Sequence, residues 1–387
     1  MRARLWVAVL MALLSFPEVA AAVATRDPRA VAPDPLPVAF ADGIQHVANL
    51  SDPVAAVGAR KVGDYFYVSS ARGIHIYDVS TPESPRLTGS LDLLHDPYYP
   101  SEDVDTNGDV LLLGVSTSAE ERGALLAVDV SDKSNPEIAG RLNRDGDHTV
   151  SCVLDCTYAY SDNGDVIFVG EGRNLLVAGN WMEGTGLAGG AHDVTEIAPG
   201  WIVTSSSPML LLDAREDPTS PRVVAHAEVK DELLDSVYAH GNLWPRRGRD
   251  RFLLLGGEKV GPCSKTQNAG LFTYDVSRWR SEGVAEPVDS FRLDNGSPTD
   301  GNAPYNTNCA HWFDTHPRWR NGGLVAMAWY EHGTRLLQVD GAGRIEERGY
   351  FLPVDGSAWA AYWISDDVVY TVDYNRGVDV LEVTAEP

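Results

Sequence analysis

Five residues that can bind a metal ion recur at matching places along this chain of 387 residues. Four short segments begin with a histidine, at His148, His192, His240 and His311, and the preceding segment carries Glu102 at the same place. Imidazole is the commonest transition-metal ligand, and several neutral histidines beside a carboxylate suit Cu, Fe, Mn or Zn. The pattern predicts one transition-metal ion held by the four histidines, with Glu102 as a fifth ligand or a base. The alternative is that duplication spread histidines that only form hydrogen bonds.

A repeated phrase explains why these segments are equivalent. An apolar run, an acidic residue, a proline-bearing turn and a second alternating run occur at residues 73–91, 125–142 and 209–227, with weaker copies ending at Asp275, Asp340 and Glu382. Asp340 and Glu382 are 42 residues apart (382 minus 340). A period of about 40–45 residues with four short strands per unit is typical of a β-propeller. With one degenerate copy near Gly170, the sequence predicts an all-β, seven-bladed propeller of four-stranded blades.

The repeat also places the five residues in space. The phrase marks the third and fourth strands of each blade, so the segments with the histidines and Glu102 form the first strands, which line the central channel. Equivalent starts of inner strands face the same mouth of the channel, so these five side chains are expected to converge there. In a regular strand the next residues, Asp103 and Asp193, would point away from the channel and orient neighbouring groups.

Residues 44–50 resemble a fourth strand with no blade before it, and the chain ends after residues 377–383 without a fourth strand. The N-terminal strand is therefore expected to complete the last blade and close the ring, which leaves no sheet edge exposed.

The repeats, with phrases such as residues 148–152, 191–194, 309–314 and 329–335, resemble those of secreted bacterial propeller proteins built from LVIVD repeats. The resemblance covers nearly all of the mature chain. It implies the propeller fold and export, and it implies no particular reaction.

Composition and the N-terminus indicate the compartment. A basic start, an apolar run too short for a membrane span and a group of small residues predict a secretion signal peptide over 1–24. Residues 25–43, rich in Pro and Ala, are expected to form a flexible leader, and 44–387 the propeller. The net charge of −24 argues against nucleic acid and anionic lipid as partners. We expect a secreted or periplasmic monomer without membrane insertion.

Four cysteines in an exported chain fit two disulfides. Cys152 and Cys156 can pair if the chain turns between them, which leaves Cys263 to pair with Cys309. A cysteine-ligated metal is the rival interpretation, but the chain has no CxxC pair.

Other candidate site residues lie in loops and on aromatic positions. Glu331 and His332 lie in a loop on the expected channel face and are candidates for acid–base catalysis, or for exposed polar groups beside a turn. Arg335 could bind an acidic substrate or pair with a carboxylate. Trp312 and Trp359 lie near the starts of inner strands and are candidates for stacking on a sugar or aromatic substrate, although packing between blades is the commoner role of large side chains.

Two functional hypotheses follow. The first is a metal-dependent oxidoreductase or lyase that acts on a small-molecule or saccharide ligand. The second is a non-catalytic binding module at the cell surface or in the periplasm.

Overall fold

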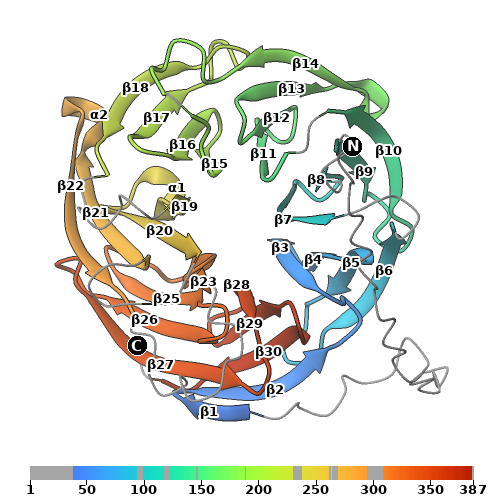
Figure 1. The fold of residues 1–387 in the computed structure, drawn as a ribbon, viewed down its shortest axis with the longest axis vertical. Coiled ribbons are helices and arrows are strands. Elements are labelled where there is room, and N and C mark those ends of the chain that lie inside the picture. The colour runs from blue at the N-terminus through green and yellow to red at the C-terminus, as the bar shows by residue number, and fades with distance from the viewer. Residues whose placement is uncertain are drawn as a thin grey trace, which may run out of the picture. The chain divides into compact units, whose positions relative to one another are not determined.

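The computed structural model describes residues 38–93, 99–116, 123–144, 147–187, 189–229, 238–260, 263, 269–293 and 308–385. These residues form seven antiparallel sheets, which follow one another around a central axis as the blades of a propeller (Figure 1). The predicted seven-bladed fold is therefore confirmed. The signal peptide predicted over 1–24 and most of the leader lie outside the described residues.

In blades 1 to 5 the strands run from the channel outward in chain order, and blades 6 and 7 each add an outer strand from the N-terminal segment. Blade 1 contains β3 (Ala56–Val62), β4 (Tyr65–Ser70), β5 (Gly73–Asp78) and β6 (Arg86–Asp92). Blade 2 contains β7 (Tyr99–Thr106), β8 (Val110–Ser116), β9 (Ala124–Asp129) and β10 (Glu137–Asn143). Blade 3 contains β11 (Val150–Val153), β12 (Tyr158–Ser161), β13 (Asp165–Val169) and β14 (Leu175–Asn180). Blades 4 and 5 contain β15 (Asp193–Ala198), β16 (Trp201–Ser205), β17 (Met209–Asp213), β18 (Arg222–Ala227); β19 (Tyr238–Leu243), β20 (Phe252–Val260), β21 (Leu271–Arg278) and β22 (Val284–Phe291). Blades 6 and 7 contain β24 (Phe313–Thr315), β25 (Gly323–Ala328), β26 (Thr334–Val339), β27 (Ile345–Pro353); β28 (Ala358–Trp363), β29 (Val368–Asp373) and β30 (Gly377–Val383).

The repeated phrase forms the third and fourth strands of the blades, as predicted. Its acidic residue ends the third strand and shapes the turn that follows. Asp78 accepts a hydrogen bond from the backbone N–H of Ser80 at 2.9 Å and pairs with Arg86 at 2.7 Å. Asp129 accepts the same backbone bond from Ser131 at 2.9 Å. The acidic residue therefore recurs where a turn joins the third and fourth strands of a blade.

The N-terminal part of the chain closes the ring. β2 (Ile44–Leu50) pairs with β30 and supplies the fourth strand of blade 7, which confirms the predicted closure. His46 Nε2 lies 2.8 Å from Asp379 of β30, and the Asn49 amide donates to the same carboxylate at 3.0 Å. β1 (Val38–Asp42) pairs with β27 as a fifth strand of blade 6. This end of the segment 25–43 is therefore a strand, not a flexible leader, because β27 offers it an unpaired edge.

The apolar core lies between neighbouring blades. Phe66 of blade 1, for example, packs edge-on against Tyr370 of blade 7, with ring centroids 5.3 Å apart, in a cluster drawn from both sheets. The helices of the described residues are single turns, namely η1 (Glu171–Arg173), α1 (Pro245–Gly248) and α2 (Trp279–Glu282). Among these residues, no helix has the length and apolar character that a membrane crossing requires.

Both predicted disulfides are present. Cys152 and Cys156 join the ends of a tight turn, where Leu154, Asp155 and Cys156 all have positive φ. Cys263 and Cys309 are joined across 46 residues of sequence. This second bridge ties the chain after β20 to β23 (Asn308–Cys309), which pairs with β20. Two disulfides indicate an oxidising environment.

Candidate metal centre

The backbone brings Glu102 and the four histidines to one end of the inner strands. His192 lies immediately before β15, and His148 and His311 lie two residues before β11 and β24. His240 and Glu102 lie within β19 and β7, where the strand pairing shifts register between Ala239 and Asn242 and between Pro100 and Val104. Such bulges turn a side chain away from its regular direction. Both residues are buried, with 0% and 4% of their surface exposed.

Two glycines make room for this arrangement. A Cβ atom on Gly58 of β3 would lie 1.7 Å from the carbonyl oxygen of Glu102, so only glycine lets the two inner strands approach at this point. A Cβ on Gly241 would lie 2.6 Å from the Trp312 ring. That ring packs beside His240, with ring centroids 4.7 Å apart. The close packing around Glu102 and His240 therefore requires glycine at positions 58 and 241.

One carboxylate sits at the centre of the four imidazoles. The Nε2 atoms of His148, His192 and His240 each lie 3.1 Å from Oε1 of Glu102, and Nε2 of His311 lies 2.8 Å from Oε2. The imidazole rings form a continuous series, with centroid separations of 5.0 Å, 3.8 Å and 4.3 Å along the order 148, 192, 240 and 311. The convergence expected from the repeat is present, and two overlapping groups, Glu102 with His240 and His311 and Glu102 with His148 and His192, have spacing that could hold a metal ion.

The cluster is closed on one side and open on the other. The side chains of His240 and His311 are fully buried. The His192 side chain is 14% exposed and that of His148 is 51% exposed. The cluster is therefore most exposed to solvent at His148.

The electrostatics favour an ionised Glu102 and act differently on the imidazoles. Burial, with the charges of His192 and His311, holds the pKa of His240 well below its usual value. Burial would raise the pKa of Glu102. The charges of His311 and His240 and the hydrogen bonds of the other two imidazoles outweigh it, and the pKa lies well below the usual range. Burial would lower the pKa values of His148 and His311, but the Glu102 carboxylate outweighs it and raises the pKa of His148 to about 9 and that of His311 above its usual value. Metal ligation requires neutral imidazoles, so binding of an ion would release the protons that Glu102 stabilises on these rings.

The hydrogen bonds of His311 fix which of its ring nitrogens carries a proton. Its Nδ1 contacts the backbone carbonyl oxygen of Trp359, which can only accept, so Nδ1 carries the hydrogen. In a neutral ring, Nε2 then presents a lone pair to Glu102 Oε2 at 2.8 Å and has no hydrogen-bond partner among the described residues. Two lone pairs at that distance repel each other unless a cation lies between them or the ring carries a second proton.

A second acidic residue adjoins the cluster and was not predicted as a site residue. Glu258 Oε2 lies 3.8 Å from Nε2 of His240, and Glu258 with His192 and His240 forms a further group with metal-ligand spacing. Tyr330 donates a hydrogen bond to Glu258 Oε1 at 2.6 Å, and its ring lies 4.7 Å from that of His311. Neither residue lies at the repeat position of the histidines, and the directions of the two side chains depend on backbone details that the repeat does not encode.

The two predicted aromatic residues both contact the cluster. Besides its contact with His240, Trp312 has its ring centroid 6.3 Å from that of His311. The Trp359 ring lies 5.3 Å from His311 and 5.5 Å from Tyr330. Both tryptophans are half-buried, so each leaves part of its surface for a ligand.

The other predicted residues lie around the turn after β25. Arg335 is fully buried, and its guanidinium pairs with Glu347 at 3.0 Å, which is the carboxylate pairing left open as an alternative to substrate binding. His332 is 2% exposed. Glu331 is half-buried, and burial raises its pKa to about 7. Neither belongs to the groups with metal-ligand spacing among the described residues.

One expectation about the residues after the cluster is wrong. Asp103 and Asp193 line the channel instead of pointing away from it. Strict alternation fails for Asp103 because it lies in the bulge of β7. It fails for Asp193 because the strand β15 begins at this residue, so His192 before it is not part of the alternating strand.

Comparisons with known proteins agree with this architecture. No curated protein matches the sequence. Hydrazine synthase of Kuenenia stuttgartiensis has a similar structure with a TM-score of 0.57 and 13% identity, covering 87% of this chain and 97% of that one. The WD40 repeats of RRP9 match with a TM-score of 0.57 and 12% identity, covering 90% and 99%. The β-propeller domain of Nup133 from Vanderwaltozyma polyspora matches with a TM-score of 0.56 and 9% identity, covering 88% and 97%. At these identities the likeness shows the fold alone.

A sequence comparison identifies the repeat itself. The LVIVD repeat family matches residues 61–92 and 119–144. These residues include the third and fourth strands of blades 1 and 2, which carry the repeated phrase. The chain is thus a seven-bladed β-propeller that carries LVIVD repeats.

Proposed function

We propose that the four histidines and Glu102 hold one transition-metal ion, and that the protein is an exported metal-dependent enzyme acting on a small-molecule or saccharide substrate. The observation that carries the proposal is the convergence of four imidazole Nε2 atoms on one buried carboxylate, with Nε2 of His311 only 2.8 Å from Glu102 Oε2. A metal ion would take the place of the second proton on His311, because both groups would then become ligands.

The spacing of the donor atoms supports a shared ion. Two ligand atoms about 2.1 Å from one metal, at right angles to each other, lie about 3.0 Å apart. The distances from Glu102 to the four Nε2 atoms are 2.8 Å and 3.1 Å, and Glu102 is shared by two groups with metal-ligand spacing, one with His240 and His311 and one with His148 and His192. Four imidazoles with a carboxylate match the preferences of Cu, Fe, Mn or Zn.

The open side of the cluster supports catalysis over a purely structural role. Structural metal sites are enclosed by their ligands, whereas catalytic sites keep a coordination position for water or substrate. Here His148 is half-exposed, while His240 and His311 are buried. A substrate that enters past His148 would meet the metal with the half-buried rings of Trp312 and Trp359 nearby.

Proton transfer at this site has two candidate sources. Glu258 and Tyr330 form a hydrogen-bonded pair that adjoins His240 and His311. Glu331, whose pKa burial raises to about 7, would exchange protons at neutral pH. An oxidation requires a redox metal such as Cu or Fe, and an elimination proceeds with Zn or Mn as a Lewis acid. The identity of the metal therefore decides between an oxidoreductase and a lyase.

Metal analysis of the purified protein tests the proposal. After reconstitution with Cu, Fe, Mn and Zn salts in separate samples and removal of excess ions, we expect one ion per chain for the cognate metal. The His192→Ala variant should lose that ion while its circular dichroism stays unchanged. His226→Ala, which removes an exposed histidine of β18, is the matched control and should keep it. A protein that binds none of the four metals would refute the proposal and favour a non-catalytic binding module.

A further inference from the structure

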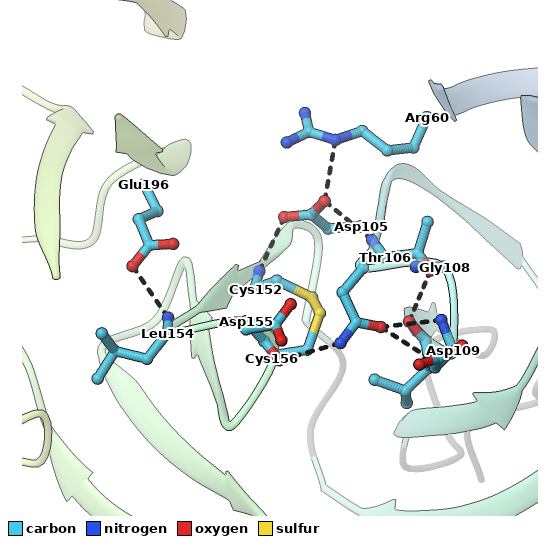
Figure 2. Close-up of a disulfide and its surroundings, with 12 residues drawn as sticks. Arg60, Asp105, Thr106, Gly108, Asp109, Cys152, Leu154, Asp155, Cys156 and Glu196 are labelled. Carbon is cyan, nitrogen blue, oxygen red and sulfur yellow. Dashed lines mark hydrogen bonds and ion pairs between the residues drawn. A yellow bond between two sulfur atoms is a disulfide. The ribbon is translucent and has the colours of Figure 1, made fainter. Parts of the chain in front are cut away.

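A second candidate site lies in the channel beyond the metal cluster. It is a cavity of about 460 Å³ whose lining includes none of the five cluster residues. Trp312 lines the cavity and also contacts His240, so its ring lies between the two places. Arg60, with 47% of its side chain exposed, and the exposed Asp155 mark where the cavity meets solvent. Figure 2 shows the part of this lining around Arg60, Asp105 and the Cys152–Cys156 disulfide.

Carboxylates from alternate blades surround the cavity. Asp105, Asp193 and Asp314 come from the inner strands of blades 2, 4 and 6. Arg60 pairs with Asp105 at 3.0 Å, and Figure 2 shows this carboxylate also accepting the backbone N–H of Cys152 at 2.8 Å. The arginine thus neutralises one of these carboxylates directly. The rest of the charged lining consists of Lys61, Asp103, Asp155 and Glu196.

The carboxylates of Asp193 and Asp314 receive hydrogen bonds from neutral donors. Asp193 accepts from the Thr195 hydroxyl at 2.7 Å. Asp314 accepts from the backbone N–H groups of Thr315 at 2.7 Å and Trp363 at 3.1 Å. Burial raises the pKa of Asp314 to about 6, against hydrogen bonds from Trp363 and Thr315 and the charges of Arg60 and Lys61. Six carboxylates line the cavity against these two cationic side chains, and this excess of negative charge favours a cationic occupant.

A buried amide independently indicates a missing donor. Asn242 of β19 is 6% exposed and lines the cavity. Its amide nitrogen donates to Ser205 Oγ at 2.8 Å, on the neighbouring blade. The side-chain oxygen of Asn242, Oδ1, accepts no hydrogen bond from the described residues. A buried acceptor without a partner costs about 1–3 kcal/mol, so an N–H group in the cavity would be stabilised there.

The size and the walls of the cavity indicate an organic ligand. Its volume of about 460 Å³ falls in the range of small-molecule sites and is far larger than a single metal ion needs. The rings of Trp312 and Tyr362 contribute flat apolar surface to the lining. Aromatic faces attract organic cations through their negative π surfaces.

We propose that this cavity binds an organic ammonium or guanidinium cation, held by Asp193 and Asp314 and packed against Trp312 and Tyr362. The site does not depend on the metal centre, so it can be tested on metal-free protein. Because Trp312 lies between the two sites, its indole fluorescence reports on occupancy of the cavity.

Calorimetric titration of the metal-free full chain tests the proposal. The probes are agmatine and spermidine, with glutarate as an anionic control and 1,4-butanediol as a neutral one. We expect one molecule of agmatine or spermidine to bind per chain and to change the tryptophan fluorescence, and the two controls to give no heat. Loss of one charged hydrogen bond in Asp314→Asn should weaken binding about tenfold, and the double variant with Asp193→Asn should abolish it.

The matched control is Asp217→Asn, which removes an exposed carboxylate from an outer turn and should leave the affinity unchanged. Equal weakening by Asp217→Asn would overturn the proposal, because it would reveal non-specific attraction to an acidic protein. Absence of binding by either cation, or tighter binding of glutarate through Arg60, would overturn it as well. Circular dichroism of each variant confirms that the propeller is folded.

Discussion

The Cys263–Cys309 disulfide should hold the buried side of the metal site in place. Cys309 is two residues before His311, and it pairs in register with Lys259, the residue after Glu258. The bridge therefore fixes two segments that carry residues of the cluster. The Cys263→Ala/Cys309→Ala variant should weaken metal binding about tenfold, the lower end of the usual effect of groups that orient metal ligands.

The effect on stability can be calculated from the loop lengths. In the chain-entropy model, the bridge across 46 residues contributes about 4 kcal/mol to the free energy of unfolding. The bridge across 4 residues contributes about 2 kcal/mol in the same model. Guanidinium denaturation of metal-free protein measures both differences against the wild type.

The matched control is the Cys152→Ala/Cys156→Ala variant. The backbone N–H of Cys152 donates to Asp105, which is not a residue of the metal cluster. Loss of the Cys152–Cys156 disulfide should therefore change stability and leave metal affinity nearly unchanged. Metal affinity is measured by competition with a chelator of known affinity. Equal losses of metal affinity in the two variants would refute the idea that the larger bridge positions the site, because the effect would then follow from general destabilisation.

Three further predictions follow from the contacts. A protein that begins at Ser51 lacks β1 and β2, and β2 carries the buried residues Ile44 and Leu50, each 6% exposed, so this protein should aggregate or melt at a much lower temperature. A melting temperature equal to that of the longer protein would contradict ring closure by β2. Burial would raise the pKa of Asp379, but hydrogen bonds from His46 and Arg376 outweigh burial and lower the pKa. The stability that Asp379 contributes is therefore present above about pH 3.9 and is lost as the pH falls through the lowered pKa. Acid denaturation should therefore be less steep in Asp379→Asn, and an unchanged profile would count against this linkage. Among the ligands, His240→Ala should reduce metal affinity more than His148→Ala, because His240 is buried and His148 is half-exposed; the reverse order in a chelator competition would contradict the geometry.

The repeat was enough to predict the architecture. A capped turn follows Asp78, Asp129 and equivalent residues of other blades, so the period gives the number of blades and the equivalent positions of their inner strands. Those positions in turn predict that His148, His192 and the other cluster residues meet. The spacing of the cysteines predicts the bridges, because Cys152 and Cys156 can pair across a turn and leave one other pair. The missing fourth strand of the last blade predicts the closure, because the N-terminal strand can complete that blade.

What the sequence did not predict depends on local departures from regular strands. The bulges in β7 and β19 rotate Glu102, Asp103 and His240 relative to simple alternation, and a bulge leaves no reliable mark in a sequence. Gly58 and Gly241 allow close contacts whose partners become visible only in the folded chain. Glu258 and Tyr330 reach the cluster from the outer end of a strand and from a turn. Their roles are set by side-chain direction, which periodicity does not encode.

X-ray absorption spectroscopy of the metal-reconstituted protein tests the central claim most directly, because it observes the ligands of the ion. We predict an outer-shell pattern of four imidazoles and a first shell of nitrogen and oxygen atoms at about 2.0–2.2 Å, with the imidazole count falling by one in His240→Ala. A spectrum without imidazole scattering, or one that His240→Ala leaves unchanged, would show that the metal binds elsewhere and would contradict the proposed centre.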